Sequence, residues 1–131
     1  MFIVCRQTLI IKTDQAPKPL AGYSQAVKAG GLIFVSGQVP VDAATGEVVG
    51  TTIQEQTAQC LRNIEYILQA ADSSLDKAVS ATFILVEETD FAGMNEEWAK
   101  WFPIDPPARQ GAKLPIRPKG IKISIALIAE A

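Results

Sequence analysis

One arginine near the C-terminal end is the side chain best placed to do chemistry. Arg109 follows Pro106, Pro107 and Ala108. The two prolines favour an extended backbone before the arginine and remove two N–H donors. An arginine held on such a backbone can bind a carboxylate through two parallel hydrogen bonds. The alternative is an ordinary surface arginine at the start of a strand.

Other side chains limit the chemistry that could accompany this arginine. The chain has no histidine, which excludes a histidine general base, a histidine-based triad and the usual zinc sites. Glu87 and Glu88 form an acidic cluster without a third ligand in view, so we interpret them as a solvated loop and expect no metal. Asn95 lies beside an apolar stripe, where an amide either makes a structural hydrogen bond or belongs to a site.

The composition fits one domain, residues 1–131, with 48% hydrophobic and 20% charged residues. A net charge of −2 argues against a broad nucleic-acid surface, although a local basic patch stays open. The N-terminal apolar run is too short for a membrane span or signal core. Cys5 and Cys60 read as buried thiols of a reducing compartment. We therefore expect a cytoplasmic protein, with the mitochondrion as the alternative, and no membrane partner.

Hydrophobic patterning predicts an α+β domain with the element order β, ββ, α, β, α, ββ. The pair Gly30-Gly31 between two short runs predicts a β-hairpin, because both glycines tolerate the positive φ of a tight turn. We expect a first strand at residues 7–12, a central strand at 78–86 and a last strand at 120–131. Residues 37–50 read as a long polar loop.

Two helices are expected between these strands. Thr52 and Glu55 form a capping box at the start of the first, whose apolar side chains recur at three- and four-residue spacing as far as Ala71. Asp90 is a suitable N-cap for the second helix. That helix has one apolar stripe, which we interpret as core packing and which consists of Phe91, Met94, Trp98 and Trp101.

The last strand predicts an oligomer. One of its faces carries Ile121, Ile123, Ile125 and Leu127, and the other carries Lys122, Ser124, Ala126 and Ile128. Two helices can cover only one face of the sheet. The apolar residues on the second face indicate that this face is also partly buried. We therefore expect a homo-oligomer whose open sheet faces turn inward.

Four stretches together resemble one known family. These are Leu20 to Val27, Phe34 to Pro40 with Thr45-Gly46, Asn95, and Pro107 to Arg109 followed by Arg117 to Ile123. In this order and spacing they resemble the YjgF/RidA family of reactive-imine deaminases, from about Gln15 to Ala129. The resemblance implies a chorismate-mutase-like fold and a homotrimer with sites at its subunit interfaces. It also implies cofactor-free hydrolysis of enamines and imines, 2-aminoacrylate among them, to 2-keto acids and ammonia.

The resemblance further implies site residues. The family's carboxylate-binding arginine falls on Arg109 and its site tyrosine on Tyr23. The serine and glycine of its Ser-Gly-Gln motif fall on Ser36 and Gly37, and its helix asparagine on Asn95. In these roles Arg109 would hold the substrate carboxylate and Tyr23 would close the pocket and orient the imine. Backbone groups near Ser36 and Gly37 would help to fix a water and stabilise the carbinolamine.

Two positions depart from the family pattern. The family commonly reads Arg-Ser-Cys after the arginine, whereas this chain reads Arg109-Gln110-Gly111, so only the Gly111 backbone can take part there. The glutamate that deaminating members carry on the last strand falls on Ser124. A serine hydroxyl stays protonated at pH 7, and no histidine is present to activate it. The alternative role for Ser124 is to fill a small polar niche in the trimer.

Four functions follow from these residues. The first is imine or enamine deamination with an altered water site. The second is a pathway enzyme that acts on an imine, enamine or carbonyl by tautomerisation, condensation or cyclisation. The third is a non-catalytic trimer that binds keto acids or related carboxylates. An RNA-cleaving or translation-inhibiting role comes last, because the chain is acidic and lacks histidine.

Overall fold

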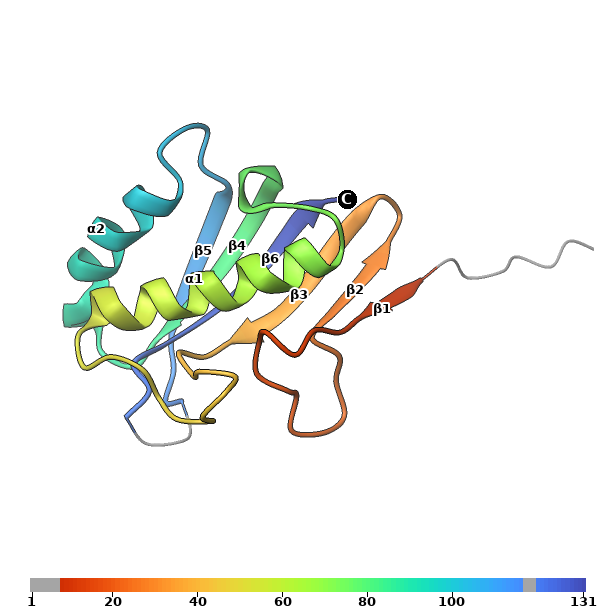
Figure 1. Cartoon of the computed structure of the whole chain (residues 1–131). Helices are drawn as coiled ribbons and strands as arrows, with labels where there is room; N and C mark the ends of the chain where they lie inside the picture. Colours follow the sequence, from red (N-terminus) through yellow and green to blue (C-terminus); the bar gives the residue numbers. More distant parts are fainter. Residues whose placement is uncertain (1–7, 117–119) are drawn as a thin grey trace, which may run out of the picture.

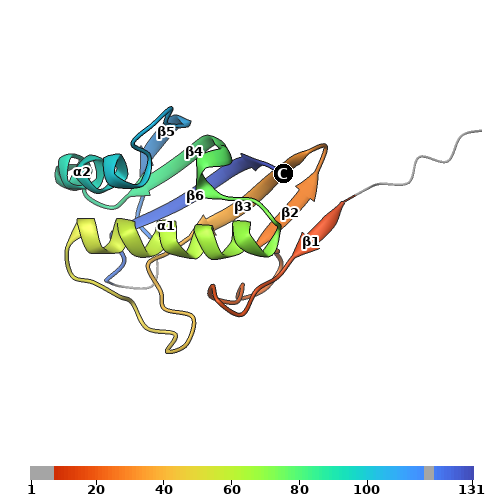
Figure 2. The ribbon, with the colours of Figure 1, turned by 45° about the horizontal axis from the view of Figure 1, so that its top comes forward.

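A six-stranded mixed sheet with two α-helices on one face makes up the fold (Figures 1 and 2). The computed structural model describes residues 8–116 and 120–131. Its strands are β1 (Leu9–Ile11), β2 (Ala26–Ala29), β3 (Leu32–Gln38), β4 (Ala78–Leu85), β5 (Ala108–Lys113) and β6 (Ile123–Glu130). They lie in the order β1-β2-β3-β6-β4-β5, with β4 and β5 parallel and the other neighbours antiparallel. The predicted α+β class and element order are confirmed.

The β2–β3 hairpin turns at Gly30 and Gly31, with φ of 59° and 77°, as the glycine pair predicts. β3 continues to Gln38, two residues further into the predicted loop than expected. Its pairing with β6 shifts register between Val35 and Gln38, which is a β-bulge. Sequence periodicity does not predict this bulge, because a break in the alternation at Ser36 and Gly37 reads equally well as the end of the strand. β1 begins at Leu9 and is shorter than predicted.

Helix α1 (Ile53–Ala70) supplies most of the core against the sheet. The predicted capping box is present: the Glu55 N–H donates to Thr52 Oγ1 over 3.1 Å and the Thr52 N–H donates to Glu55 Oε1 over 3.1 Å. The buried side chains of the helix include Cys60, Leu61, Ile64, Ile67 and Leu68. Each buried aliphatic side chain stabilises the fold by roughly 1.5–3 kcal/mol. Burial raises the pKa of the Cys60 thiol, as expected for an inert cysteine, while Cys5 lies outside the described residues.

Asp90 occupies the predicted N-cap position of helix α2 (Phe91–Trp101). Its side chain makes no capping hydrogen bond, and its backbone angles are helical, φ −83° and ψ −4°. The 3₁₀ turn η2 (Glu88–Asp90) runs directly into the helix, whereas a capping side chain usually comes from an extended residue. Gly93 allows close packing on α1, because a Cβ there would lie 2.6 Å from Ile53 Cγ2.

The apolar stripe of α2 is only partly in the core. Met94 and Trp98 are buried and Trp101 packs against the core, as predicted. Phe91 is 43% exposed, so its interpretation as a core residue is wrong. Its ring lies instead near Arg109, at the edge of the sheet. A stripe read from sequence cannot distinguish a core aromatic from one that flanks a charged side chain at the rim.

The face of the sheet opposite the helices carries apolar side chains that are only partly buried or are exposed in the single chain. In β6, Ile123, Ile125 and Leu127 point into the core, and Ser124, Ala126 and Ile128 lie on the open face, as the alternation predicts. A shallow pocket of about 160 Å³ lies on this face and is lined in part by Phe34, Ser80, Thr82, Ala126 and Ile128. No helix within residues 8–116 and 120–131 is long and apolar enough to cross a bilayer.

Candidate functional site

Arg109 occupies the second position of β5, beside Ala81 of β4. The guanidinium carbon lies 5.0 Å from the ring centre of Phe83, 5.7 Å from that of Phe91 and 5.1 Å from that of Trp98. Three aromatic rings therefore surround one cation, which is a cation–π arrangement. Partial burial lowers the pKa of Arg109, but an arginine remains charged at physiological pH.

Asn95 of α2 contacts this cation directly. The Arg109 Nη1–H donates to Asn95 Oδ1 over 2.7 Å. The partner of Asn95 is therefore the arginine predicted to bind an anion, and this bond is neither a helix cap nor a bond within α2. Among the described residues, the ion pairs are Lys100–Glu97 and Lys113–Glu88, and neither includes Arg109. The remaining guanidinium donors are therefore open to an anion from outside the chain.

Gly111 lies two residues further along β5, on the same face as Arg109. It pairs with Phe83 across the parallel strands, and a Cβ at this position would lie 2.1 Å from the Phe83 ring. The chain therefore needs glycine here for space. A cysteine in its place would require the ring to move.

Ser36, Gly37 and Ser124 form a second cluster, at the bulge between β3 and β6. The Ser36 hydroxyl donates to the Ser24 carbonyl over 2.6 Å, which fastens the bulge to the loop before β2. A Cβ on Gly37 would lie 3.0 Å from Ser124 Oγ, so the two residues are in contact. Bulges often lie next to active sites, because they re-aim backbone groups. Gly37 and Ser124 are therefore neighbours across β3 and β6, and Ser36 precedes Gly37 in β3.

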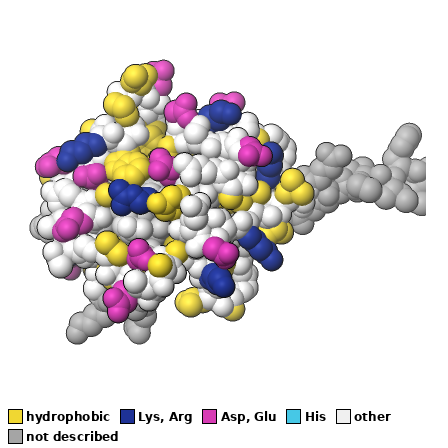
Figure 3. Space-filling view, viewed as in Figure 1, with side chains coloured by type: hydrophobic (Ala, Val, Ile, Leu, Met, Phe, Trp, Pro, Cys, Tyr) yellow, Lys and Arg dark blue, Asp and Glu magenta, His cyan; other side chains and the backbone are white. Residues whose placement is uncertain are grey.

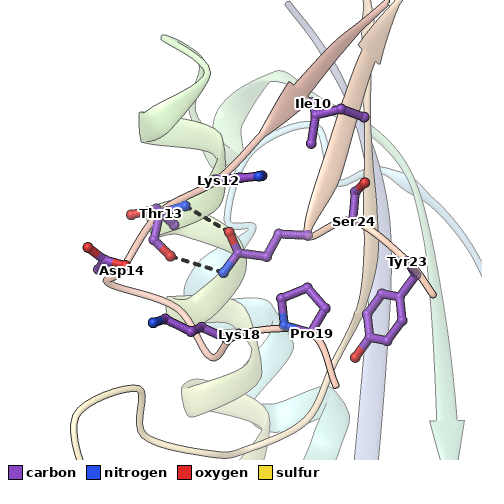
Figure 4. A pocket seen from close by; sticks show the side chains of 9 residues that line it. Ile10, Lys12, Thr13, Asp14, Lys18, Pro19, Tyr23 and Ser24 are labelled. Atoms are coloured by element: carbon purple, nitrogen blue, oxygen red, sulfur yellow. Dashed lines mark hydrogen bonds between the residues drawn. The ribbon is translucent and has the colours of Figure 1, made fainter. Parts of the chain in front are cut away.

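Tyr23 lies in the loop that precedes β2 and is 52% exposed. It lines one side of a groove of about 790 Å³ together with Lys18, Pro19 and Ser24 (Figure 4). Sequence reasoning did not identify what holds this loop. The buried amide of Gln25 accepts from the Thr13 N–H over 2.7 Å and donates to the carbonyls of Thr13, Ala16 and Pro17. The sequence signal that could have indicated this anchor is Gln25 itself, a polar residue two positions after Tyr23 at the start of the predicted hairpin.

The two clusters lie on opposite faces of the sheet. Arg109 faces helix α2, through Asn95 and Trp98. Its neighbour Gln110 points the other way and donates to Thr82 Oγ1 over 3.2 Å. Thr82 lines the open face, as Ser124 does by the alternation of β6. One chain therefore does not bring Arg109 and Ser124 into the same pocket.

The aromatic surroundings of Arg109 were also missed from sequence. Phe83 reads as an ordinary core residue of an apolar strand, and it is indeed only 9% exposed. Its proximity to Arg109 and Gly111 depends on the register of β4 and β5, which no local pattern specifies. The one available signal is that glycine replaces a larger residue two positions after the arginine.

The chain is similar to known proteins over most of its length. A model of the family described as Endoribonuclease L-PSP matches residues 13–131. A RutC family protein of Pyrococcus horikoshii is 45% identical over 92% of this chain and 95% of its own length. The chloroplastic Reactive Intermediate Deaminase A of Arabidopsis thaliana is 38% identical over 92% of this chain and 64% of its own.

Solved structures agree with these relatives. A putative endoribonuclease of Thermotoga maritima superposes with a TM-score of 0.88 at 38% identity, covering 94% of this chain and 97% of its own. TdcF of E. coli with bound serine superposes with a TM-score of 0.87 at 32% identity, covering 94% and 98%. Taken with the arginine, asparagine and bulge geometry, these matches show that the chain belongs to the YjgF/RidA family.

Proposed function

We propose that this protein hydrolyses reactive enamines and imines of the 2-aminoacrylate type to 2-keto acids and ammonia, without a cofactor. Arg109 carries the proposal, because it is a cation held by Asn95 and three rings without an acidic partner among the described residues. The name of the Arabidopsis relative supports deamination. The serine bound to TdcF, like the proposed substrates, bears a carboxylate.

Arg109 would bind the substrate carboxylate through the edge of its guanidinium. The rings of Phe83, Phe91 and Trp98 approach the cation from β4 and α2, and Asn95 takes one donor. The remaining donors can form two parallel bonds to a carboxylate. Arg109 is exposed to solvent in the single chain, so these donors are accessible to a ligand.

The reaction itself needs water, a proton and correct positioning. An enamine first takes a proton at carbon and becomes an imine. Water then adds to the C=N carbon and a proton passes to nitrogen, which gives a carbinolamine. The carbinolamine loses ammonia as the C=O bond forms. Free imines are strong electrophiles, so holding the imine and a water in line can supply much of the rate gain.

Ser124 limits the rate that the proposed site can reach. A serine can hold a water by a hydrogen bond, but it is a poor general base at pH 7. The bulge at Ser36 and Gly37 supplies backbone groups beside it. We expect turnover to be slower, by about 10²–10⁴-fold, than in a site with a proton-transferring carboxylate.

The proposed assembly is a homotrimer. Two copies would be needed to form one site, because Arg109 and Ser124 lie on opposite faces of one sheet. The half-buried apolar open face, with Phe34 44% exposed, supports contact between copies there. The partners we propose are further copies of this chain and a small carboxylate-bearing imine, enamine or keto acid.

Ser124 also favours a second candidate from the same pocket. An enzyme that tautomerises, condenses or cyclises a carbonyl or imine substrate does not need to activate water. The same loss of the carboxylate would suit a trimer that binds keto acids without turnover. Ribonuclease activity, which the family description names, has less support. Acidic and basic side chains are interspersed on the helix face (Figure 3), and the chain has no histidine.

An imine competition assay tests the proposal. An amino-acid oxidase generates imines in the presence of semicarbazide, and semicarbazone formation is followed with and without the protein. Wild type should suppress semicarbazone formation. Arg109→Ala should suppress it at least tenfold less, because the carboxylate loses a charge-assisted pair. Arg62→Ala, which removes an arginine over Trp101, is the matched control and should behave as wild type.

The other outcomes separate the candidates. If wild type is inert and Ser124→Glu gains activity, the pocket has lost deamination, and tautomerisation or binding replaces it. If wild type and Arg109→Ala are equally active, the Arg109 site is not where the imine reacts. Cleavage of an RNA substrate that disappears at high salt would favour the ribonuclease description instead.

A further inference from the structure

The Phe83 ring occupies the space that any side chain at position 111 would need. An ideal Cβ on Gly111 would lie 2.1 Å from Cζ and 2.2 Å from Cε2 of Phe83, far inside contact distance. The two residues are direct partners in the β4–β5 pairing. Phe83 is 9% exposed and packed in the core, so it cannot move aside without repacking. With phenylalanine at 83, position 111 therefore has room only for glycine.

The same ring supports Arg109. Its centre lies 5.0 Å from the guanidinium carbon and 5.8 Å from the ring centre of Phe91. Phe91 is 43% exposed and less constrained, whereas Phe83 and Trp98 are fixed by the core. Phe83 thus contacts the guanidinium from the sheet, and Trp98 contacts it from α2. Long arginine side chains lose considerable rotamer entropy when they bind a ligand, so a cation held in advance binds more tightly.

We propose that Phe83 and Gly111 act together as the positioning element of the anion site: Gly111 admits the Phe83 ring, and the ring holds Arg109 ready for a carboxylate. This deepens the proposed function and rests on it for the identity of the substrate. Phe83 is a positioning residue, because it acts through Arg109.

Carboxylate binding and one NMR signal test this proposal. The full chain is titrated with 2-oxobutanoate, and the Arg109 Nε–H resonance, which the rings shift by ring currents, is followed in parallel. Phe83→Val should weaken binding by about 2- to 30-fold, the range of one cation–π contact. It should also move the Arg109 resonance towards its free value. Gly111→Cys should do the same, because the ring is displaced.

The double variant Phe83→Val/Gly111→Cys decides whether the two residues form one unit. Once the ring is gone, the cysteine costs nothing further, so the double variant should bind no more weakly than Phe83→Val alone. Leu75→Ala, a cavity in the same core, is the control for general destabilisation and should leave binding and the resonance unchanged. In the imine assay, Phe83→Val should raise KM and leave kcat within about twofold.

Other results would overturn the proposal. An unchanged dissociation constant and resonance in Phe83→Val would do so even if Gly111→Cys failed to fold. If the double variant loses affinity by the product of the two single-variant losses, the two positions act separately. Neither readout needs turnover, so an inactive protein that still shows the predicted binding pattern would refute deamination and leave the positioning role intact.

Discussion

Arg109 is solvent-exposed in β5, and the ion pairs among the described residues do not include it. Its guanidinium contacts Asn95 and ring faces instead, none of which carries a negative charge. The sequence could identify Arg109 and Asn95, since a proline pair and family motifs mark them. It could not show that they are hydrogen-bonded, or that Phe83 backs the cation, because these contacts join β4, α2 and β5.

Replacement of Asn95 by Asp tests whether Arg109 is kept free for a ligand. An aspartate carboxylate at the same place, 2.7 Å from Nη1, would pair with the guanidinium and compete with the substrate. We expect Asn95→Asp to weaken 2-oxobutanoate binding by about 10- to 100-fold, equivalent to about 1.5–3 kcal/mol, without loss of thermal stability. Glu96→Gln on the same helix is the matched control. Unchanged binding in Asn95→Asp would contradict the role of Arg109.

At the scale of elements, the chain follows its hydrophobic pattern closely, and the departures are local. Amphipathic periodicity predicts α1, the hairpin and the faces of β6, because burial decides them. Local sequence rules fail at Asp90, which lacks a capping hydrogen bond because a 3₁₀ turn leads into α2, and at the bulge of β3, where the register shifts. Both lie next to the candidate site. Local rules are weakest where the chain must aim particular groups rather than bury apolar surface.

The capping box of α1 should be visible as a pH-dependent contribution to stability. Hydrogen bonds from Thr52 lower the pKa of Glu55 below its ordinary value of 4.5. Because the folded-state pKa is depressed, the contribution is present above the unfolded pKa and is lost as pH falls through the folded one. Thr52→Ala should cost about 1 kcal/mol of unfolding free energy at pH 7.

Glu55→Gln is the variant that isolates the charge. Its stability relative to wild type should be lowest near neutral pH and should recover as the medium is acidified, as measured by urea unfolding at a series of pH values. Glu65→Gln, on the same helix but away from its start, should show no such trend. An equal pH trend in both variants would refute the assignment.

At the scale of the whole molecule, the sheet separates the Arg109–Asn95 cluster from the Gly37–Ser124 cluster. The apolar second face of β6, in a chain too short to cover it, leads to the prediction of an oligomer from sequence. The residues that meet between copies depend on how the copies assemble, and the sequence of one chain does not specify this. Arg109 and Asn95 form one half of the proposed site on the helix face, and Gly37 and Ser124 form the other on the open face. The account requires copies of the chain to bring these halves together.

A crystal structure of the full chain with 2-oxobutanoate, a product-like keto acid, tests this central claim most directly. The account predicts that the carboxylate binds the Arg109 guanidinium of one copy, with Ser124 and the Gly37 backbone of a neighbouring copy closing the site. Arg109→Ala crystals treated in the same way should show no ligand there. A keto acid bound away from Arg109, or a site completed by one chain alone, would contradict the account.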